Sequence, residues 1–217
     1  MKRTTAVVAS IATLALTASL AGCKVVPTTF KGTPVTEDRT VTTFDSIELR
    51  GAGDVTVVSG SDYSLTVRAN AALMDNIHTS IVGSTLIIDE DQQTGNNRIE
   101  FIIHVPSLSS VEVLGAGSIT VTGVDSEEFA VAVAGAADVS VSGRATTFVA
   151  VLSGVGEIDA SSLAAKDVTA RLSGVGSISV AASTTLDAAA SGVGEIFYTG
   201  DPSVTSKVTG IGQVTRG

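Results

Sequence analysis

The chain of 217 residues is 44% hydrophobic but only 4% aromatic, with 22 glycines and no Trp. Any core must therefore be built from Val, Ile, Leu and Ala, in one or two domains. The 22 acidic against 13 basic residues give a net charge of −9, which argues against a nucleic-acid partner because phosphates would be repelled. One Cys and two His cannot form an internal disulfide or fill a usual zinc site, so we expect no metal and no cofactor.

Residues 1–22 have the organisation of a secretory signal peptide. Lys2 and Arg3 form a basic start, residues 6–20 are uncharged and largely apolar, and small residues close the segment. The apolar run is too short and wrongly flanked to span a membrane. The sequence therefore predicts an exported protein.

A single cysteine directly follows this segment. Leu20-Ala21-Gly22-Cys23 resembles the bacterial lipoprotein box, in which the thiol is lipidated and the chain is cut just before it. We expect acyl chains such as palmitate on Cys23, because several chains on one residue make membrane anchoring stable. The other interpretation is an ordinary signal peptide beside an isolated Cys. Lys24 in the next position resembles sorting patterns that favour an outer membrane, where the host has two membranes.

The remaining chain divides into a tether and a β-rich domain. Residues 23–40 carry prolines and a glycine without a sustained period, which predicts an extended tether. We expect the domain over residues 41–217, with wider first coils or a cap over 41–110 and regular coils over 111–217. Bare strand edges at the end of a stack invite aggregation, so a cap has a physical purpose.

The first part of this domain lacks a simple repeat. Residues 65–67, 85–88 and 99–103 predict longer strands because they are rich in β-branched and apolar residues. Residues 70–76 predict a short helical turn. Residues 89–97 are polar and predict a hairpin-like loop.

A short glycine motif repeats through the chain: Gly-x-Gly, then a polar residue, then Val or Ile. Its copies begin at Gly51, Gly115, Gly154, Gly174, Gly192 and Gly210, and a seventh copy at Gly135 has Ala137 in place of the second Gly. From residue 115 onward the first glycines are 20, 19, 20, 18 and 18 residues apart. A period this short corresponds to one coil of a solenoid.

Apolar and polar residues alternate on both sides of each glycine corner. Around Gly115, for example, Val111, Val113 and Ile119 occupy the apolar columns while Glu112 lies between two of them. This period of two predicts strands with one buried face, joined by a corner where a Cβ would block the backbone. Parallel stacking would lay like residues over like in an aliphatic core. We therefore predict an all-β fold, a single-stranded right-handed parallel β-helix (β-solenoid) with coils of about 18–20 residues.

The order of these motifs resembles a known family. Residues 44–49 (Phe-Asp-Ser-Ile-Glu-Leu), 73–77 (Leu-Met-Asp-Asn-Ile) and 105–108 (Val-Pro-Ser-Leu), followed by the successive Gly-Val-Gly copies, look like the GIN domain, also called DUF2807. The match covers residues 40–217, and its specificity lies in the ordered combination. The resemblance implies a β-helical module at the cell surface or in the periplasm, described as an adhesin head, with no catalytic motif to carry over.

The polar residue after each corner forms a column along the predicted stack. Asp138 and Glu157 would lie one coil apart in it, close enough to repel each other or to share a cation such as calcium. The other interpretation is a solvated turn, because the calcium-binding nonapeptide repeat has a different spacing.

In two neighbouring coils the outward positions become apolar. These positions are Ala130, Ala132, Ala134, Val149 and Val151. A row of exposed small aliphatic residues on a flat sheet can bind another protein. Alternatively, the segment of residues 61–105 covers it.

Carbohydrate-active enzymes also use β-helices. Asp159, Arg171 and Asp187 are predicted outward in adjacent coils and could form a small cluster, but Phe197 is the only aromatic residue expected outward in the repeat. Carbohydrate subsites usually include aromatic platforms. We therefore predict a lipid-anchored, non-catalytic envelope protein that presents a rigid surface for adhesion or for contact with a protein or polysaccharide. The alternatives are a carbohydrate-active enzyme or polysaccharide-binding module, and a structural spacer.

Overall fold

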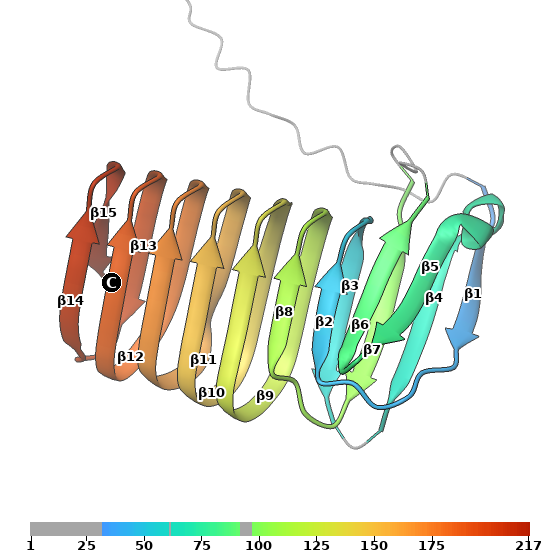
Figure 1. Cartoon of the computed structure of the whole chain (residues 1–217), viewed down its shortest axis with the longest axis horizontal. Coiled ribbons are helices and arrows are strands. Elements are labelled where there is room, and N and C mark those ends of the chain that lie inside the picture. Colours follow the sequence, from blue (N-terminus) through green and yellow to red (C-terminus); the bar gives the residue numbers. More distant parts are fainter. Residues whose placement is uncertain (1–31, 61, 92–96) are drawn as a thin grey trace, which may run out of the picture.

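The chain folds into a parallel β-solenoid (Figure 1). The computed structural model describes residues 32–60, 62–91 and 97–217. The predicted signal peptide, Cys23 and the tether up to residue 31 lie outside the described residues. Within the described part, no helix is long and apolar enough to cross a membrane.

The elements follow one another as strands with one 3₁₀ helix. Their bounds are β1 Pro34–Arg39, β2 Ser46–Leu49, β3 Ala52–Ser59, β4 Ser64–Asn70, η1 Ala71–Asn76, β5 Ile77–Val82, β6 Thr85–Glu90, β7 Glu100–Val105, β8 Ser110–Val113, β9 Ala116–Val133, β10 Ala136–Leu152, β11 Val155–Leu172, β12 Val175–Ala190, β13 Val193–Thr199, β14 Ser203–Val208 and β15 Ile211–Arg216.

Each of the long strands β9 to β12 contains most of one coil. It begins after a glycine corner on one face of a flattened stack, passes through a bend, and ends on the other face at the next corner (Figure 1). All neighbours in this part pair in parallel. In the view of Figure 1, the strands on the near face run upward, and the chain then passes through the corner to the far face. Because successive coils are added toward the C-terminal end, this sense of rotation makes the solenoid right-handed.

The apolar columns predicted on both sides of the corners form the core. One column joins Val55, Ile119, Val139, Ile158, Ile178 and Ile196, which pair in register from coil to coil and are all buried. The columns before the corner are buried in the same way from Ile47 and Leu49 to Ala188 and Ala190. Each large aliphatic side chain removed from water in this way contributes about 1.5–3 kcal/mol.

The bends opposite the corners also take part in the pairing between coils. Backbone pairing continues through them, for example from Asp125 to Arg144, with a register shift between Val141 and Gly143. Because stacked bends also pair their backbone groups with the next coil, few polar groups are left without a partner. The solenoid therefore has a continuous hydrogen-bonded wall on this side.

The N-terminal region is both a first coil and a cap. β2 and β3 pair in parallel with β8 and β9 and thus continue the regular stack. β4 pairs antiparallel with β7, and β5 pairs antiparallel with β6. Between β4 and β5, η1 occupies the predicted helical turn, and the Asn70 side chain accepts a hydrogen bond of 3.0 Å from the Ala72 amide at its start.

Two expectations for this region were wrong. The tether does not extend to residue 40, because Pro34–Arg39 forms β1 and pairs antiparallel with β4, whose edge would otherwise stay open. The segment of residues 89–97 does not close a hairpin either. β6 joins β2 and β5, whereas β7 joins β3 and β4, so the segment connects strands that do not pair with each other.

From Gly115 onward, the first glycine of each corner is required by the close approach of two coils. A Cβ built on Gly154 would lie 1.9 Å from the carbonyl oxygen of Gly135 and 2.5 Å from that of Ala134. Backbone atoms cannot yield as a flexible side chain can, so this position excludes every other residue. The second position is equally close in most coils, since a Cβ on Gly156 would lie 1.9 Å from the Ala137 carbonyl oxygen at a φ of +142°. One coil differs, because Ala137 occupies this position without a positive φ.

Gly154→Ala is therefore expected to destabilise the protein by about 3 kcal/mol, since the new methyl group forces two coils apart. Denaturant unfolding followed by circular dichroism measures the change. Gly60→Ala is the matched control, because a Cβ at Gly60 meets nothing within 4 Å. Equal unfolding midpoints for the two variants would contradict the packing argument.

Candidate functional site

The apolar residues predicted to face outward form a strip on the face made by the strand ends before the corners. We call Ala130, Ala132, Ala134, Val149 and Val151 the lateral patch. Ala130 pairs with Val149 and Ala132 pairs with Val151 in adjacent coils. All five side chains are partly or fully exposed.

Charged residues bound the lateral patch on both sides. Glu112 pairs with Ala132 in the preceding coil, and Arg171 pairs with Val151 in the following one. The described strands of residues 62–91 and 97–105 lie at the N-terminal end of the stack (Figure 1), so they do not cover the patch. The patch is thus an apolar strip two coils wide between Glu112 on one side and the ion pair of Arg171 with Asp187 on the other.

The possible catalytic cluster does not form. Arg171 makes a two-pronged ion pair with Asp187, with 3.0 Å between Nη1 and Oδ1. This hydrogen-bonded guanidinium lowers the pKa of Asp187, so that carboxylate is a poor proton acceptor. Asp159 lies across the coil on the opposite face, where it accepts hydrogen bonds from the hydroxyl and amide of Ser161 at 2.6 and 3.0 Å. The sequence indicated only that these residues face outward and not to which face each belongs.

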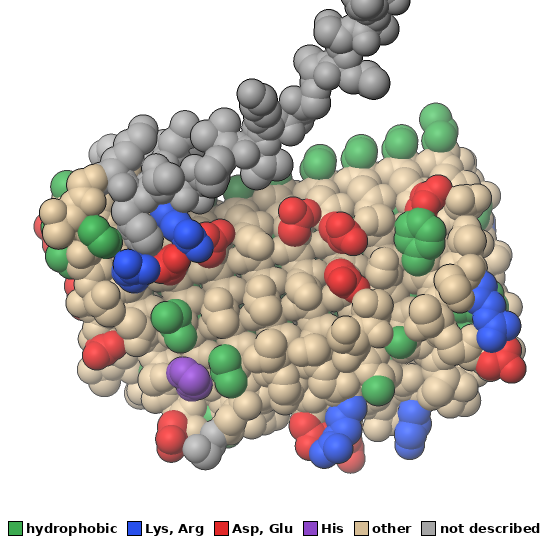
Figure 2. Space-filling view, turned by 180° about the vertical axis from the view of Figure 1, so that it is seen from behind, with side chains coloured by type: hydrophobic (Ala, Val, Ile, Leu, Met, Phe, Trp, Pro, Cys, Tyr) green, Lys and Arg blue, Asp and Glu red, His purple; other side chains and the backbone are tan. Residues whose placement is uncertain are grey.

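The acidic residues after the corners lie on the opposite face, which Figure 2 shows. Asp138, Glu157 and Asp159 line a shallow depression of about 210 Å³. Asp138 Oδ1 accepts a hydrogen bond of 3.1 Å from the Glu157 amide, so one carboxylate already caps the next coil. In the described ranges, no three His, Cys, Asp or Glu residues are grouped so that they could hold a metal ion.

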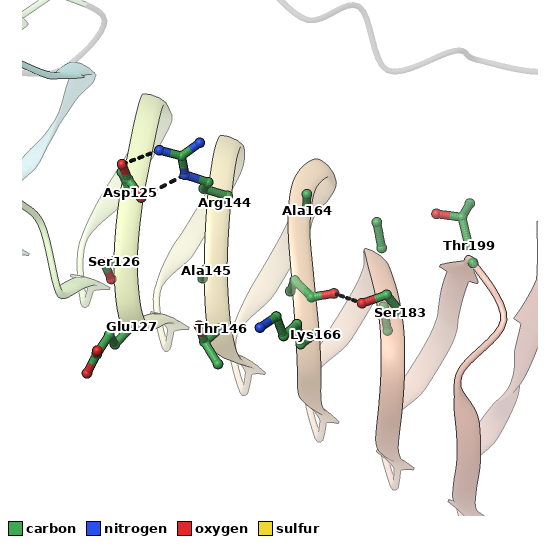
Figure 3. A pocket seen from close by; sticks show the side chains of 14 residues that line it. Asp125, Ser126, Glu127, Arg144, Ala145, Thr146, Ala164, Lys166, Ser183 and Thr199 are labelled. Carbon is green, nitrogen blue, oxygen red and sulfur yellow. Dashed lines mark hydrogen bonds and ion pairs between the residues drawn. The ribbon is translucent and has the colours of Figure 1, made fainter.

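A groove along the bends was not predicted from the sequence (Figure 3). Its volume is about 780 Å³, and it crosses successive coils from β9 to β13. Small buried residues, Ala145, Ala165 and Ala182, line it, while Asp125 and Arg144 form a two-pronged ion pair at its border. This ion pair lowers the pKa of Asp125. The available signal in the sequence was an alanine in the middle of each of these coils, 10, 11 and 8 residues after Gly135, Gly154 and Gly174.

A second feature that the sequence analysis did not predict is a row of exposed aliphatic side chains, which occupy the middle position of the Gly-x-Gly corners. Val155, Val175, Val193 and Ile211 are 57%, 50%, 47% and 76% exposed. Figure 2 shows hydrophobic side chains in a row along this edge. We call these four residues the corner ridge. The identity of the middle residue was readable from the sequence, but not its exposure.

These features define a right-handed parallel β-solenoid whose candidate sites are elongated outer surfaces. A family model described as "Putative auto-transporter adhesin, head GIN domain" matches residues 43–202, and the chain belongs to this family. Membership confirms the resemblance found in the sequence and groups the chain with adhesin-like proteins of the cell envelope or surface. A search of curated proteins finds no match.

Solved structures of low sequence identity share the fold. A protein described as a putative adhesin from Bacteroides fragilis is 22% identical, with a TM-score of 0.72 over 87% of this chain and 99% of that one. A protein from Parabacteroides distasonis, described as a putative lipid binding protein, is 21% identical, with a TM-score of 0.51 over 86% of this chain and 98% of that one. At these identities the likeness concerns the fold alone.

Proposed function

We propose that this protein is a non-catalytic, lipid-anchored component of the cell envelope that uses the flank of its solenoid for adhesion or for organising other envelope macromolecules. The lateral patch is the observation that carries this proposal. Its alanines and valines offer apolar area that gains free energy when a partner covers it. The charge of Glu112 at one border would orient that partner, since Arg171 at the other border is paired with Asp187.

The rigidity of the solenoid supports a role in contact. The patch lies on strands whose inward neighbours, Val131 and Ala150, are fully buried in the aliphatic core. A surface held by such packing loses little conformational entropy when it binds. The family membership agrees with this proposal, since its members are described as adhesin heads.

The lipid anchor would keep the solenoid close to a membrane. Between Cys23 and the start of β1 at Pro34 there are ten residues, which can span at most about 35 Å when fully extended. An outer membrane is the proposed location in a host with two membranes, with the domain facing either the periplasm or the surface.

Cys23→Ala should abolish lipid attachment and release the exported protein from the membrane fraction, because acyl chains supply the anchoring free energy. Metabolic labelling with a palmitate analogue, followed by fractionation, measures both effects. Cys23 is the only cysteine, so any label retained by the variant would show that the anchor is not on this thiol.

Val151→Glu should weaken binding of the purified protein to intact envelopes or cells at least about tenfold, because a buried unpaired carboxylate disfavours an apolar contact. Quantitative binding of fluorescently labelled protein measures this effect. Val82→Glu makes the same change at the end of β5, where Val82 is 63% exposed, and is the matched control. Equal binding by wild type and Val151→Glu would contradict a role for the lateral patch.

Polysaccharide binding is a second candidate function, favoured by the groove along the bends. Its volume of about 780 Å³ is in the range of ligand sites, and its length suits an extended chain. Lys166 on its border offers a hydrogen-bond donor, while the Ser183 hydroxyl already donates to the Ala165 carbonyl oxygen at 3.1 Å. Cation binding at Asp138 and Glu157 also remains a proposal; unchanged melting with and without calcium after removal of both carboxylates would dismiss it.

A further inference from the structure

The edge of the solenoid that carries the corner ridge is apolar and uncharged at each corner within residues 114–212. There the residue before each first glycine is Leu, Ala, Ser or Thr, and the middle residue is Ala, Val or Ile. Leu114, which is 44% exposed, adds another aliphatic side chain to this edge. The opposite edge, along the bends, carries Glu127, Arg144 and Lys166. Figure 2 shows the hydrophobic row and the charged side chains along opposite edges of the stack.

The backbone of the corner ridge has its amides already paired. Each of the four amides donates a hydrogen bond of 2.9 Å to the carbonyl oxygen of the first glycine in the preceding coil. A surface that enters lipid cannot carry unpaired backbone donors, because no water is there to satisfy them. The corner ridge meets this requirement through the stacking of the coils.

The chain enters the described domain at this same edge. Pro34 pairs with Asn70 in β4, and the register from β4 through β7 to β3 places both residues in the row of Ala52, the middle residue of the first corner. Ala52 pairs with Ala116, and the same row continues from coil to coil into the corner ridge. β1 therefore starts at the corner edge and runs from it toward the bends (Figure 1).

A lipid on Cys23 would hold this edge near a membrane. The ten residues between Cys23 and Pro34 span at most about 35 Å. From β1 to β11, where the corner ridge begins with Val155, there are six strand steps, which amount to about 29 Å at about 4.8 Å each. Because the tether keeps the ridge at a high effective concentration beside the bilayer, a weak apolar contact is enough to hold it there.

We propose that the corner ridge lies in the surface of the lipid bilayer to which the chain is anchored, so that the solenoid rests lengthwise on the membrane. This inference rests on the proposed lipid anchor at Cys23. The acids after the corners, such as Glu157 and Glu195, stand two residues further from the edge than the ridge, which is about 7 Å along the strand, and they stay in water. Both faces of the solenoid then stand upright, and the lateral patch faces along the membrane toward neighbouring envelope macromolecules.

The depth of a single Trp in lipid vesicles tests the inference, because the chain has no Trp of its own. The lipidated protein is reconstituted in vesicles of phosphatidylethanolamine and phosphatidylglycerol, with and without brominated acyl chains. Emission from Val175→Trp should shift to shorter wavelength and be quenched at least about twofold by the brominated lipid, since an interfacial side chain reaches the acyl boundary. Thr184→Trp is the matched control, because Thr184 is exposed at the bend of the same strand, β12. Its emission should stay unquenched.

Val193→Trp repeats the measurement on the next coil and decides the matter if Val175→Trp alters the circular dichroism spectrum. Flotation of the wild type with the vesicles reports the anchor separately. Flotation with no quenching at the ridge overturns the inference and leaves the anchor standing, whereas loss of flotation overturns both. A blue shift without quenching shows that protein rather than lipid covers the ridge, and equal quenching of Thr184→Trp shows that the solenoid has no fixed edge toward the membrane. Either result contradicts the proposal.

Discussion

The short distance between successive coils constrains every other feature of this protein. Paired strands lie about 4.8 Å apart, so each residue is in contact with its counterparts in the coils before and after it. At the first corner position this distance leaves no space for a side chain from Gly115 onward, and that position is glycine in all seven copies. Along the faces the same distance aligns aliphatic residues into columns such as that from Ile119 to Ile196.

Because the interior is filled by these columns, function is left to the outer surface. Outward residues also align in rows, so a few apolar positions in two coils become a continuous patch. The same alignment produces the groove over Ala145, Ala165 and Ala182 and the ridge of corner valines.

Much of the fold could be predicted because the repeat encodes it directly. The alternation around Gly115 and its copies identifies inward and outward residues, and the period gives the coil length. The non-repetitive part was less predictable. Nothing local in Pro34–Arg39 distinguishes an edge strand from a tether, because the strand depends on pairing with the distant β4.

The candidate sites were also hard to predict wherever they depend on pairing between residues that are distant in the sequence. The alternation predicts that Asp159 and Arg171 face outward, but the position of the bend decides that they lie on opposite faces. The groove depends on which alanines meet across coils, and such contacts follow from the register rather than from the local sequence. The lateral patch could be predicted because it needs only the inward and outward alternation in two adjacent coils.

The most direct test of this account is the measurement of methyl–methyl nuclear Overhauser effects in solution. The account predicts a series of contacts that links Ile158 to Ile178 and Ile178 to Ile196, each one coil apart. It also predicts cross-strand contacts of parallel type between the backbones of β10, β11 and β12. Missing isoleucine contacts together with antiparallel cross-strand contacts in this region would contradict a stacked parallel solenoid.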